Sequence, residues 1–244
     1  ETFSCAVLEG GHVSCWGRNP GSVFVLGHSS AIAAISTPSA LPAIWLPQAV
    51  YGRVVQVRAG GSGSVNRRAC ILSNSGEIWC WGDNQSRYMG IGSSPSAVPG
   101  YDAVQLHFPS SACITQFDLG LHGGCAVSKN GSVFCWGPNI AGALGQHTLL
   151  GVGTGINVAT HKPLADIDPV PIVNDTQAIA VESGSLHSCA LLIDGSVQCW
   201  GGALALGVYV SGGVTPLTTG TTSPGLPADF YGTVPLPEPV VSIS

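Results

Sequence analysis

Four copies of one short pattern constrain the fold of this chain more than any other feature. In each copy, two cysteines stand ten positions apart, and Trp-Gly follows the second cysteine. The copies are CAVLEGGHVSCWG at 5–17, CILSNSGEIWCWG at 70–82, CAVSKNGSVFCWG at 125–137 and CALLIDGSVQCWG at 189–201. Recurrence of one unit along a chain is typical of repeat proteins, in which each unit buries its apolar face against its neighbours. We therefore expect a single repeat array.

Each copy predicts a β-hairpin with a three-residue loop. Such loops combine a type I turn with a glycine in the left-handed conformation, which forms a G1 bulge. If 129–131 is the loop of the third copy, Cys125 lies opposite Cys135. The same alignment places a glycine, which avoids the Cβ clash of other residues, at the left-handed position of every copy. These glycines are Gly11, Gly76, Gly131 and Gly195.

This register predicts that the cysteines of each copy are bonded to each other. Counted from the loop, they occupy non-hydrogen-bonded sites, where Cα atoms lie about 4.5 Å apart, a distance that a disulfide can span. The predicted disulfides are Cys5–Cys15, Cys70–Cys80, Cys125–Cys135 and Cys189–Cys199. Reduced core cysteines are the alternative, and zinc binding would need closer ligand pairs such as C-x-x-C. The ninth cysteine, Cys113, is left over; we expect a buried thiol, with a bridge to another chain as the alternative.

The segments around the hairpins carry a family resemblance. They read VVQVRAGGSGSVNRRACIL before the second cysteine pair, ITQFDLGLHGGCAV before the third and AIAVESGSLHSCALL before the fourth, with CWGPNIAGALGQ after the third. This pattern resembles the regulator of chromosome condensation (RCC1) repeat, in an extracellular disulfide-containing form. The resemblance implies an all-β fold, a β-propeller-like array of about four blades with a disulfide-bonded hairpin in each. Family members usually have seven blades, whereas this chain supplies four repeats.

The repeats divide the whole chain, 1–244, into one array. The expected repeats are 1–52, 53–112, 113–176 and 177–244. The chain starts within a repeat, at ETFSCAVL, and its last residues, PEPVVSIS, resemble the strand that opens a repeat. Two interpretations follow for 240–244: the strand completes the first blade of its own chain, or it pairs with a neighbouring copy.

The composition restricts the partners. Only 9% of residues are charged, against roughly 25% in typical soluble domains, and the net charge is −5. This gives no reason to expect nucleic acid or an anionic membrane as a partner, and no apolar run is long enough for a membrane span. A neutral surface with a large buried fraction explains the sparse charge, and so does a surface covered by glycans or neighbouring subunits.

Three N-glycosylation sequons support the second explanation. They begin at Asn84, Asn130 and Asn174, and Asn130 falls on a predicted hairpin tip, where it is alternatively a simple turn residue. Long segments rich in Pro, Ser and Thr separate the hairpins and are candidates for contact surfaces or carbohydrate attachment. These segments are 35–48, 91–100 and 215–230.

Few polar residues of the sequence suggest a catalytic or metal-binding role. His122 and His187 stand at similar places before the repeat cysteines, and a structural role is favoured because a catalytic residue seldom recurs in each repeat. Asp166 and Asp168 are read as surface-loop residues rather than cation ligands. No G-x-S-x-G, H-E-x-x-H or phosphate-binding glycine loop is present, so we expect no catalytic residue, metal site or cofactor.

Three functions follow in order of preference. Disulfides persist in oxidising compartments, so the first is a non-enzymatic extracellular structural or assembly module, glycosylated and packed in a filament or matrix. It would associate with itself or with other extracellular proteins. The second is a secreted protein-binding propeller, such as an inhibitor or receptor-like domain. The third, guanine-nucleotide exchange, is implied by the family name but fits poorly with disulfides, because that activity is expected in a reducing compartment.

Overall fold

The described part of the chain is built from β-strands. The computed structural model describes residues 3–18, 26, 34–35, 44, 46–62, 65–84, 88–91, 97–98, 102–139, 142–145, 164–201, 232–234 and 236–243. Within these residues the helical structure is confined to short 3₁₀ turns, such as η4 (Leu164–Asp166) and η5 (Val173–Asp175). The expected all-β fold is therefore confirmed. No helix in the described ranges has the length and apolar character needed to cross a membrane.

The strands form four antiparallel sheets, counted over the described residues. The first sheet contains β1 (Phe3–Val7), β2 (Val13–Arg18) and β3 (Ala34–Ile35). The second contains β4 (Val54–Ser62), β5 (Val65–Ser73), β6 (Ile78–Asp83) and β7 (Ala97–Val98), and β8 (Val104–Leu106) also pairs with β6. The third contains β9 (Ile114–Leu119), β10 (Gly124–Ser128) and β11 (Val133–Trp136). The fourth contains β12 (Ala178–Ser183), β13 (His187–Leu192), β14 (Val197–Gly201) and β15 (Gly232–Thr233).

The cysteine hairpin is the common unit of the four sheets. It consists of β1–β2, β5–β6, β10–β11 and β13–β14, and in each the two cysteines are directly opposite each other. All four predicted disulfides are present, with Cα atoms 4.0 to 4.1 Å apart. The turns also follow the predicted register. In the third hairpin, Ser128 N–H donates to Ser132 C=O and Gly131 adopts φ +80°.

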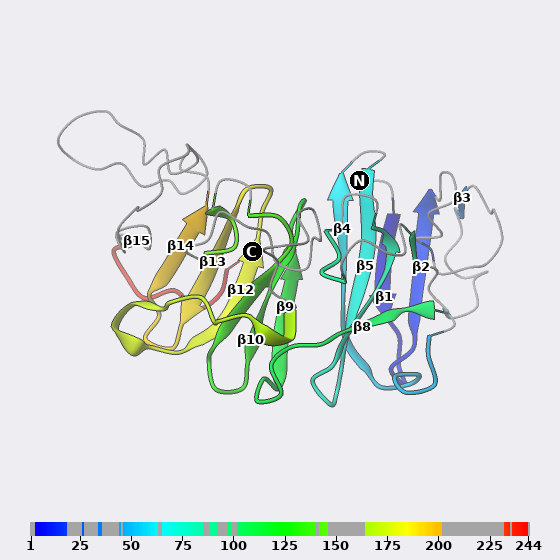
Figure 1. Cartoon of the computed structure of the whole chain (residues 1–244), viewed down its shortest axis with the longest axis horizontal. Helices are drawn as coiled ribbons and strands as arrows, with labels where there is room; N and C mark the ends of the chain where they lie inside the picture. The colour runs from blue at the N-terminus through cyan, green and yellow to red at the C-terminus, as the bar shows by residue number, and fades with distance from the viewer. Residues whose placement is uncertain are drawn as a thin grey trace.

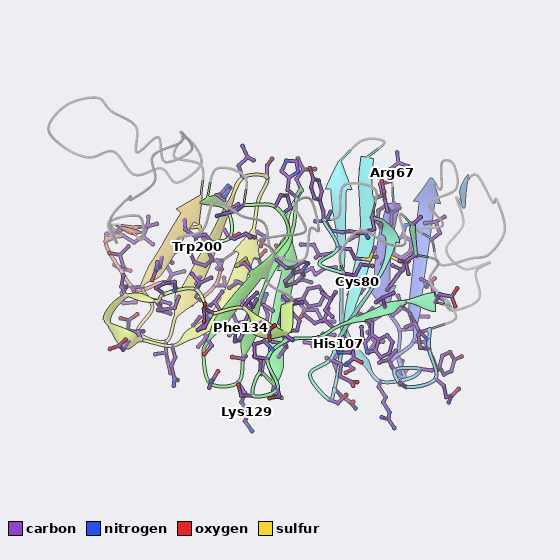
Figure 2. The ribbon with its side chains drawn as sticks, viewed as in Figure 1. Arg67, Cys80, His107, Lys129, Phe134 and Trp200 are labelled. Carbon is purple, nitrogen blue, oxygen red and sulfur yellow. A yellow bond between two sulfur atoms is a disulfide. The ribbon has the colours of Figure 1, made fainter. Side chains whose placement is uncertain are left out.

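The sheets stand side by side in chain order, from the blue first sheet to the yellow fourth sheet (Figure 1). Neighbouring sheets meet through the strands that precede the hairpins, since β4 lies against β9 and β9 against β12. The tryptophan of the Cys-Trp-Gly step enters the core in the second, third and fourth sheets, where Trp81, Trp136 and Trp200 are buried. Figure 2 shows Trp200 and Phe134 among the sheets, with Lys129 at a hairpin tip pointing away from them.

The ninth cysteine differs from our expectation. Cys113 is the free cysteine and is exposed, so the prediction of a buried thiol is wrong. The physical reason is its position one residue before β9, where the chain passes the turns of two hairpins. Its carbonyl accepts Lys129 N–H at 2.7 Å, and its side chain lies beside Gly76 at the edge of the sheet. Of the long segments, 215–230 and most of 35–48 and 91–100 lie outside the described residues.

Candidate functional site

The strand that precedes each cysteine hairpin, here called the opening strand, pairs with the hairpin in one fixed register. The opening strands are β4, β9 and β12. Their fifth residue lies opposite the first cysteine of the hairpin: Arg58 opposite Cys70, Asp118 opposite Cys125 and Glu182 opposite Cys189. In all three the register shifts near the second residue, which forms a bulge. The second, third and fourth sheets therefore share one register between the opening strand and the hairpin.

The first sheet differs because β1 pairs with β2 only, within the residues that the structure describes. Cys5–Cys15 is a non-hydrogen-bonded pair, since Leu8 N–H donates to His12 C=O and the two kinds of pair alternate. The backbone N–H and C=O groups of Cys5 and Val7 therefore point away from β2. In the second sheet the equivalent groups face β4. We call this unpaired side of β1 the open edge.

Apolar side chains along the open edge are more exposed than the residues at the same positions of the other hairpins. Leu8 is 44% exposed, whereas Leu192, at the same position of the fourth hairpin, is fully buried. Val7 is half-buried, whereas the equivalent Leu72 and Val127 are buried. An opening strand covers those residues in the other blades. Within the described residues, this edge of β1 therefore shows unpaired backbone groups beside uncovered apolar side chains.

The segment 240–243 is placed as an opening strand. Val240 N–H donates to Gly195 C=O at 2.8 Å, as Ala178 N–H donates to Gly131 C=O at 3.1 Å between the third and fourth blades. Val241 then stands at the bulge position and is 93% exposed, whereas the bulge residue Ile179 is 50% exposed. Residues 240–243 therefore occupy the place of the next blade's opening strand.

Two glutamines connect the opening strands of neighbouring blades. Gln116 donates from Nε2 to Val181 C=O and accepts from Val181 N–H, both at 2.9 Å. Gln56 makes the same pair of bonds to Phe117, at 3.0 and 3.3 Å. We call each pair a glutamine clamp. The equivalent residue of the fourth blade is Ala180, whose side chain has no hydrogen-bonding group.

A charged cluster lies beside the clamps. Asp118 accepts from Arg58 Nε at 3.1 Å and, through its other oxygen, from Ser183 N–H at 2.8 Å, so one carboxylate contacts two neighbouring blades. Burial, the negative charge of Asp118 and a hydrogen bond between the two carboxyl groups together raise the pKa of Glu182 to about 7, although the charge of Arg58 opposes the shift. The cluster therefore holds a carboxyl group that titrates near neutral pH.

A buried guanidinium joins the second and third blades. Arg68, on β5, donates from Nη2 to the carbonyls of Gly120 and Gly123, both at 2.8 Å, and from Nη1 to Leu121 C=O at 3.2 Å. Burial lowers the pKa of Arg68 to about 10, which still leaves it charged at neutral pH. The side chain thus holds the turn between β9 and β10 against the second blade.

The two histidines lie together at the contact between the third and fourth sheets; we call each contact between neighbouring sheets a seam. His122, in the turn after β9, and His187, which begins β13, both line a small cavity between the third and fourth sheets. In each the Nδ1 atom is buried and has no hydrogen-bond partner within the described part of the chain. Burial lowers the pKa of both imidazoles, and Arg68 lowers that of His122 further. Neutral, partly buried imidazoles agree with the structural role expected from the sequence. That role stays a prediction.

The other candidate residues lie apart from this seam. Asp166 and Asp168 are both exposed, and the described ranges contain no cluster of three or more His, Cys, Asp or Glu suited to a metal. Asn84 is 1% exposed, and its Oδ1 accepts Met89 N–H at 3.3 Å, so the folded chain offers no room for a glycan there. Asn130 is exposed at its hairpin tip. Asn174 lies in η5, and its side chain falls outside the described residues.

Sequence reasoning missed the clamps and the charged cluster. The signal was present in the opening strands VVQVR, ITQFD and AIAVE, in which the fifth residue is charged and the third is glutamine in the first two. Aligned on their own first residues, these strands place Gln56 over Gln116 and Arg58 over Asp118. Their contacts, however, join residues about one repeat apart, so the alignment alone does not show which partner each side chain meets.

Comparison with known proteins agrees with this architecture. The sequence model of the regulator of chromosome condensation (RCC1) repeat matches residues 54–87 and 178–202. The chain is 29% identical over 209 residues to human E3 ubiquitin-protein ligase HERC2, covering 82% of this chain and 4% of that protein. It is 26% identical over 211 residues to the mitochondrial RCC1 domain-containing protein RUG3 of Arabidopsis thaliana, covering 83% of this chain and 40% of that protein. The chain thus spans less than half the length of these relatives.

Solved structures show the same fold. Human WBSCR16 is similar with a TM-score of 0.69 and 19% identity, over 99% of this chain and 53% of that chain. Yeast RCC1 (Prp20), solved with bound Kap60, is similar with a TM-score of 0.64 and 22% identity, over 100% of this chain and 49% of that chain. The chain therefore matches the RCC1 repeat over residues 54–87 and 178–202, and its described sheets have the propeller fold of these structures.

Proposed function

We propose that this chain is a non-catalytic protein-binding module. The observation that carries the proposal is its propeller fold, which is shared with yeast RCC1, a protein solved with Kap60 bound to it.

The proposed setting is extracellular. The four hairpin disulfides support an oxidising compartment, in which such bonds persist. The exposed Asn130 is the sequon we propose to carry a glycan: it lies at the hairpin tip, where Ser132 N–H donates to its Oδ1 at 3.3 Å. The same compartment argument disfavours nucleotide exchange, which we expect to find in reducing surroundings.

Capture of a soluble partner tests the binding function. The oxidised chain, with its glycans intact, is immobilised and exposed to an extracellular extract. We expect a specific soluble protein to be retained in a saturable manner.

The matched control is the same chain after reduction of its four disulfides, which removes the covalent bond of each hairpin. Equal retention by the reduced chain, or no retained protein, would contradict a binding function of the folded propeller.

A further inference from the structure

We propose that the cavity between the third and fourth sheets binds a carboxylate side chain of the partner protein. The inference rests on the proposed function and names the chemistry of one contact. The partner segment would carry an Asp or Glu that enters the cavity. His122 and His187, which both line the cavity, then have a role in binding in addition to the structural role expected from the sequence.

Two turns that precede hairpins shape this cavity. It is lined by residues of the turn between β9 and β10 and of the turn between β12 and β13. The two turns are in direct contact, because Leu121 N–H donates to Gly184 C=O at 3.1 Å. A Cβ on Gly120 would lie 2.1 Å from the same carbonyl oxygen, so the backbones are closely packed. Ser185, which also lines the cavity, is exposed, so a ligand can enter from the protein surface.

The size of the cavity restricts the ligand. Its volume is about 20 Å³. One bound water needs roughly 10–15 Å³, so the cavity has room for one or two oxygen-sized atoms. A carboxylate presents two oxygens, whereas a phosphate group presents three acceptor oxygens and is bulkier. Size therefore favours a carboxylate over a phosphate.

The described lining of the cavity offers N–H donors and contains no Asp or Glu. His122 and His187 each bury Nδ1 without a hydrogen-bond partner among the described residues. A proton on that nitrogen would lack an acceptor, so we assign the proton of each neutral imidazole to Nε2, from which it can be donated to a ligand. Trp136 also lines the cavity, and its indole nitrogen, which can only donate, has no acceptor in the same part of the chain. These groups favour a ligand that accepts hydrogen bonds.

A positive charge lies behind the wall of the cavity. Arg68 donates from Nη2 to the carbonyls of Gly120 and Gly123, both at 2.8 Å, and these two glycines line the cavity. Burial lowers the pKa of His122, and the charge of Arg68 lowers it further, so the field of the guanidinium reaches an imidazole of the lining. A metal cation bound there would meet the same repulsion, whereas a carboxylate would be attracted.

The surrounding groups give the binding a pH dependence. The ring of Tyr88 meets His122 edge-on, with centroids 5.1 Å apart, and carries no charge at neutral pH. Burial lowers the pKa of His187, and the carboxyl groups on the packed strands, Asp118 of β9 and Glu182 of β12, do not counteract it. A bound carboxylate favours the protonated form of both imidazoles, so binding raises their pKa. By linkage, binding becomes tighter as pH falls from about 7 to about 5.

Acetate tests the site with the carboxylate alone. It is added to the oxidised chain, and the ring resonances of the histidines are followed by NMR over a pH series. Sodium chloride at equal ionic strength is the control for screening. We expect acetate, and not chloride, to raise the pKa of His122 and His187. The exposed His107 lies outside the cavity lining and should not respond.

A pair of blocked tripeptides tests the site with a protein side chain. Gly-Asp-Gly carries the carboxylate, and Gly-Asn-Gly has the same shape without the charge. We expect the Asp peptide to bind at least about tenfold more tightly at pH 6, measured from the Trp136 indole resonance. His187→Phe keeps an aromatic ring and removes the N–H donor, so it should weaken binding of the Asp peptide about tenfold. His107→Phe is the matched control and should leave binding unchanged.

The outcomes separate this inference from the proposed function. Equal effects of acetate and chloride, equal binding of the two peptides, or full binding of the Asp peptide by His187→Phe would each overturn the carboxylate site. If wild type and His187→Phe capture the same protein equally well, the binding function stands and the cavity is not its contact. If acetate and the Asp peptide bind as expected but no protein is captured, the carboxylate site stands and the proposed function fails. Intact mass and circular dichroism confirm that each variant keeps its four disulfides and its fold.

Discussion

At the residue scale, charged side chains that are wholly or partly buried make the contacts between neighbouring blades. Asp118 contacts Arg58 of the second blade and the backbone of Ser183 in the fourth, and Glu182 lies beside it. Arg68 is fully buried among carbonyl groups. These polar contacts join blades, whereas the apolar contacts fill them. Single substitutions of these residues therefore test how strongly neighbouring blades are held together.

Glu182→Gln should change the pH dependence of stability. The folded pKa, about 7, lies above the ordinary value of 4.5, so the stabilising effect of the proton is complete below pH 4.5 and is lost as pH rises to about 7. Glutamine cannot ionise beside Asp118. We expect the variant to unfold at higher urea concentration than wild type at pH 8, with the difference shrinking by pH 5. Equal pH slopes, or a slope changed as much by Glu77→Gln outside the cluster, would refute this assignment.

Arg68→Met should be among the most destabilising single changes. It removes the guanidinium donor of the Gly120 and Leu121 carbonyls and one of the two donors to the Gly123 carbonyl, and we expect the free energy of unfolding to fall by about 2–4 kcal/mol. The control is Arg58→Met, which removes a partly exposed ion pair and should cost under about 1 kcal/mol. Denaturation in urea at pH 7 measures both. A smaller loss for Arg68 than for Arg58 would show that the buried guanidinium does not hold the seam.

At the element scale, the hairpin turn has two roles. Its left-handed glycine sets the register that brings the cysteines together, and its carbonyl accepts the first N–H of the following opening strand. The second role requires close approach of two backbones. Glycine is therefore needed at Gly131 for conformation and for space.

Gly131→Ala separates these two requirements. The substitution must keep φ at +80°, and its Cβ would overlap the side chain of Gln177. Gly142 has a similar φ of +77°, but a Cβ there would meet its nearest atom, Gly201 Cα, at 3.9 Å. We expect Gly142→Ala to cost about 1–2 kcal/mol from conformation alone and Gly131→Ala roughly 2–4 kcal/mol. Thermal unfolding measures the difference, and equal losses would mean that the turn yields to the added methyl group.

At the scale of the whole molecule, stability is a sum over blades and over the seams between neighbours, as in other repeat arrays. The seams are unequal. The second and third blades each reach forward with a glutamine clamp, whereas the fourth blade has Ala180 at that position. The seam from the fourth blade to Val240–Ile243 therefore lacks the side-chain clamp that the seams from the second and third blades have.

Ala180→Gln should strengthen that seam. By analogy with Gln116 and Val181, the new side chain is expected to bond the backbone N–H and C=O of Ile243. We expect slower hydrogen exchange at the Ile243 amide by about tenfold, which corresponds to about 1.4 kcal/mol. Gln116→Ala provides the reciprocal comparison, with faster exchange at Val181. Unchanged exchange at Ile243 would show that the C-terminal strand is not held as an opening strand.

The sequence by itself determined the hairpins. The turn glycine and the cysteines lie within a few residues of each other, so local geometry alone specified the disulfides, the left-handed turns and the all-β repeat. Only the tertiary structure decided whether Cys113 and Asn84 are exposed and which residues the clamp glutamines contact. The burial of Asn84 and the exposure of Cys113 depend on how loops and neighbouring hairpins cover a site, and Gln116 meets Val181 only because two blades pack together. Contacts between separate repeats carry no fixed spacing along the chain, and that is why pattern and turn chemistry did not reveal them.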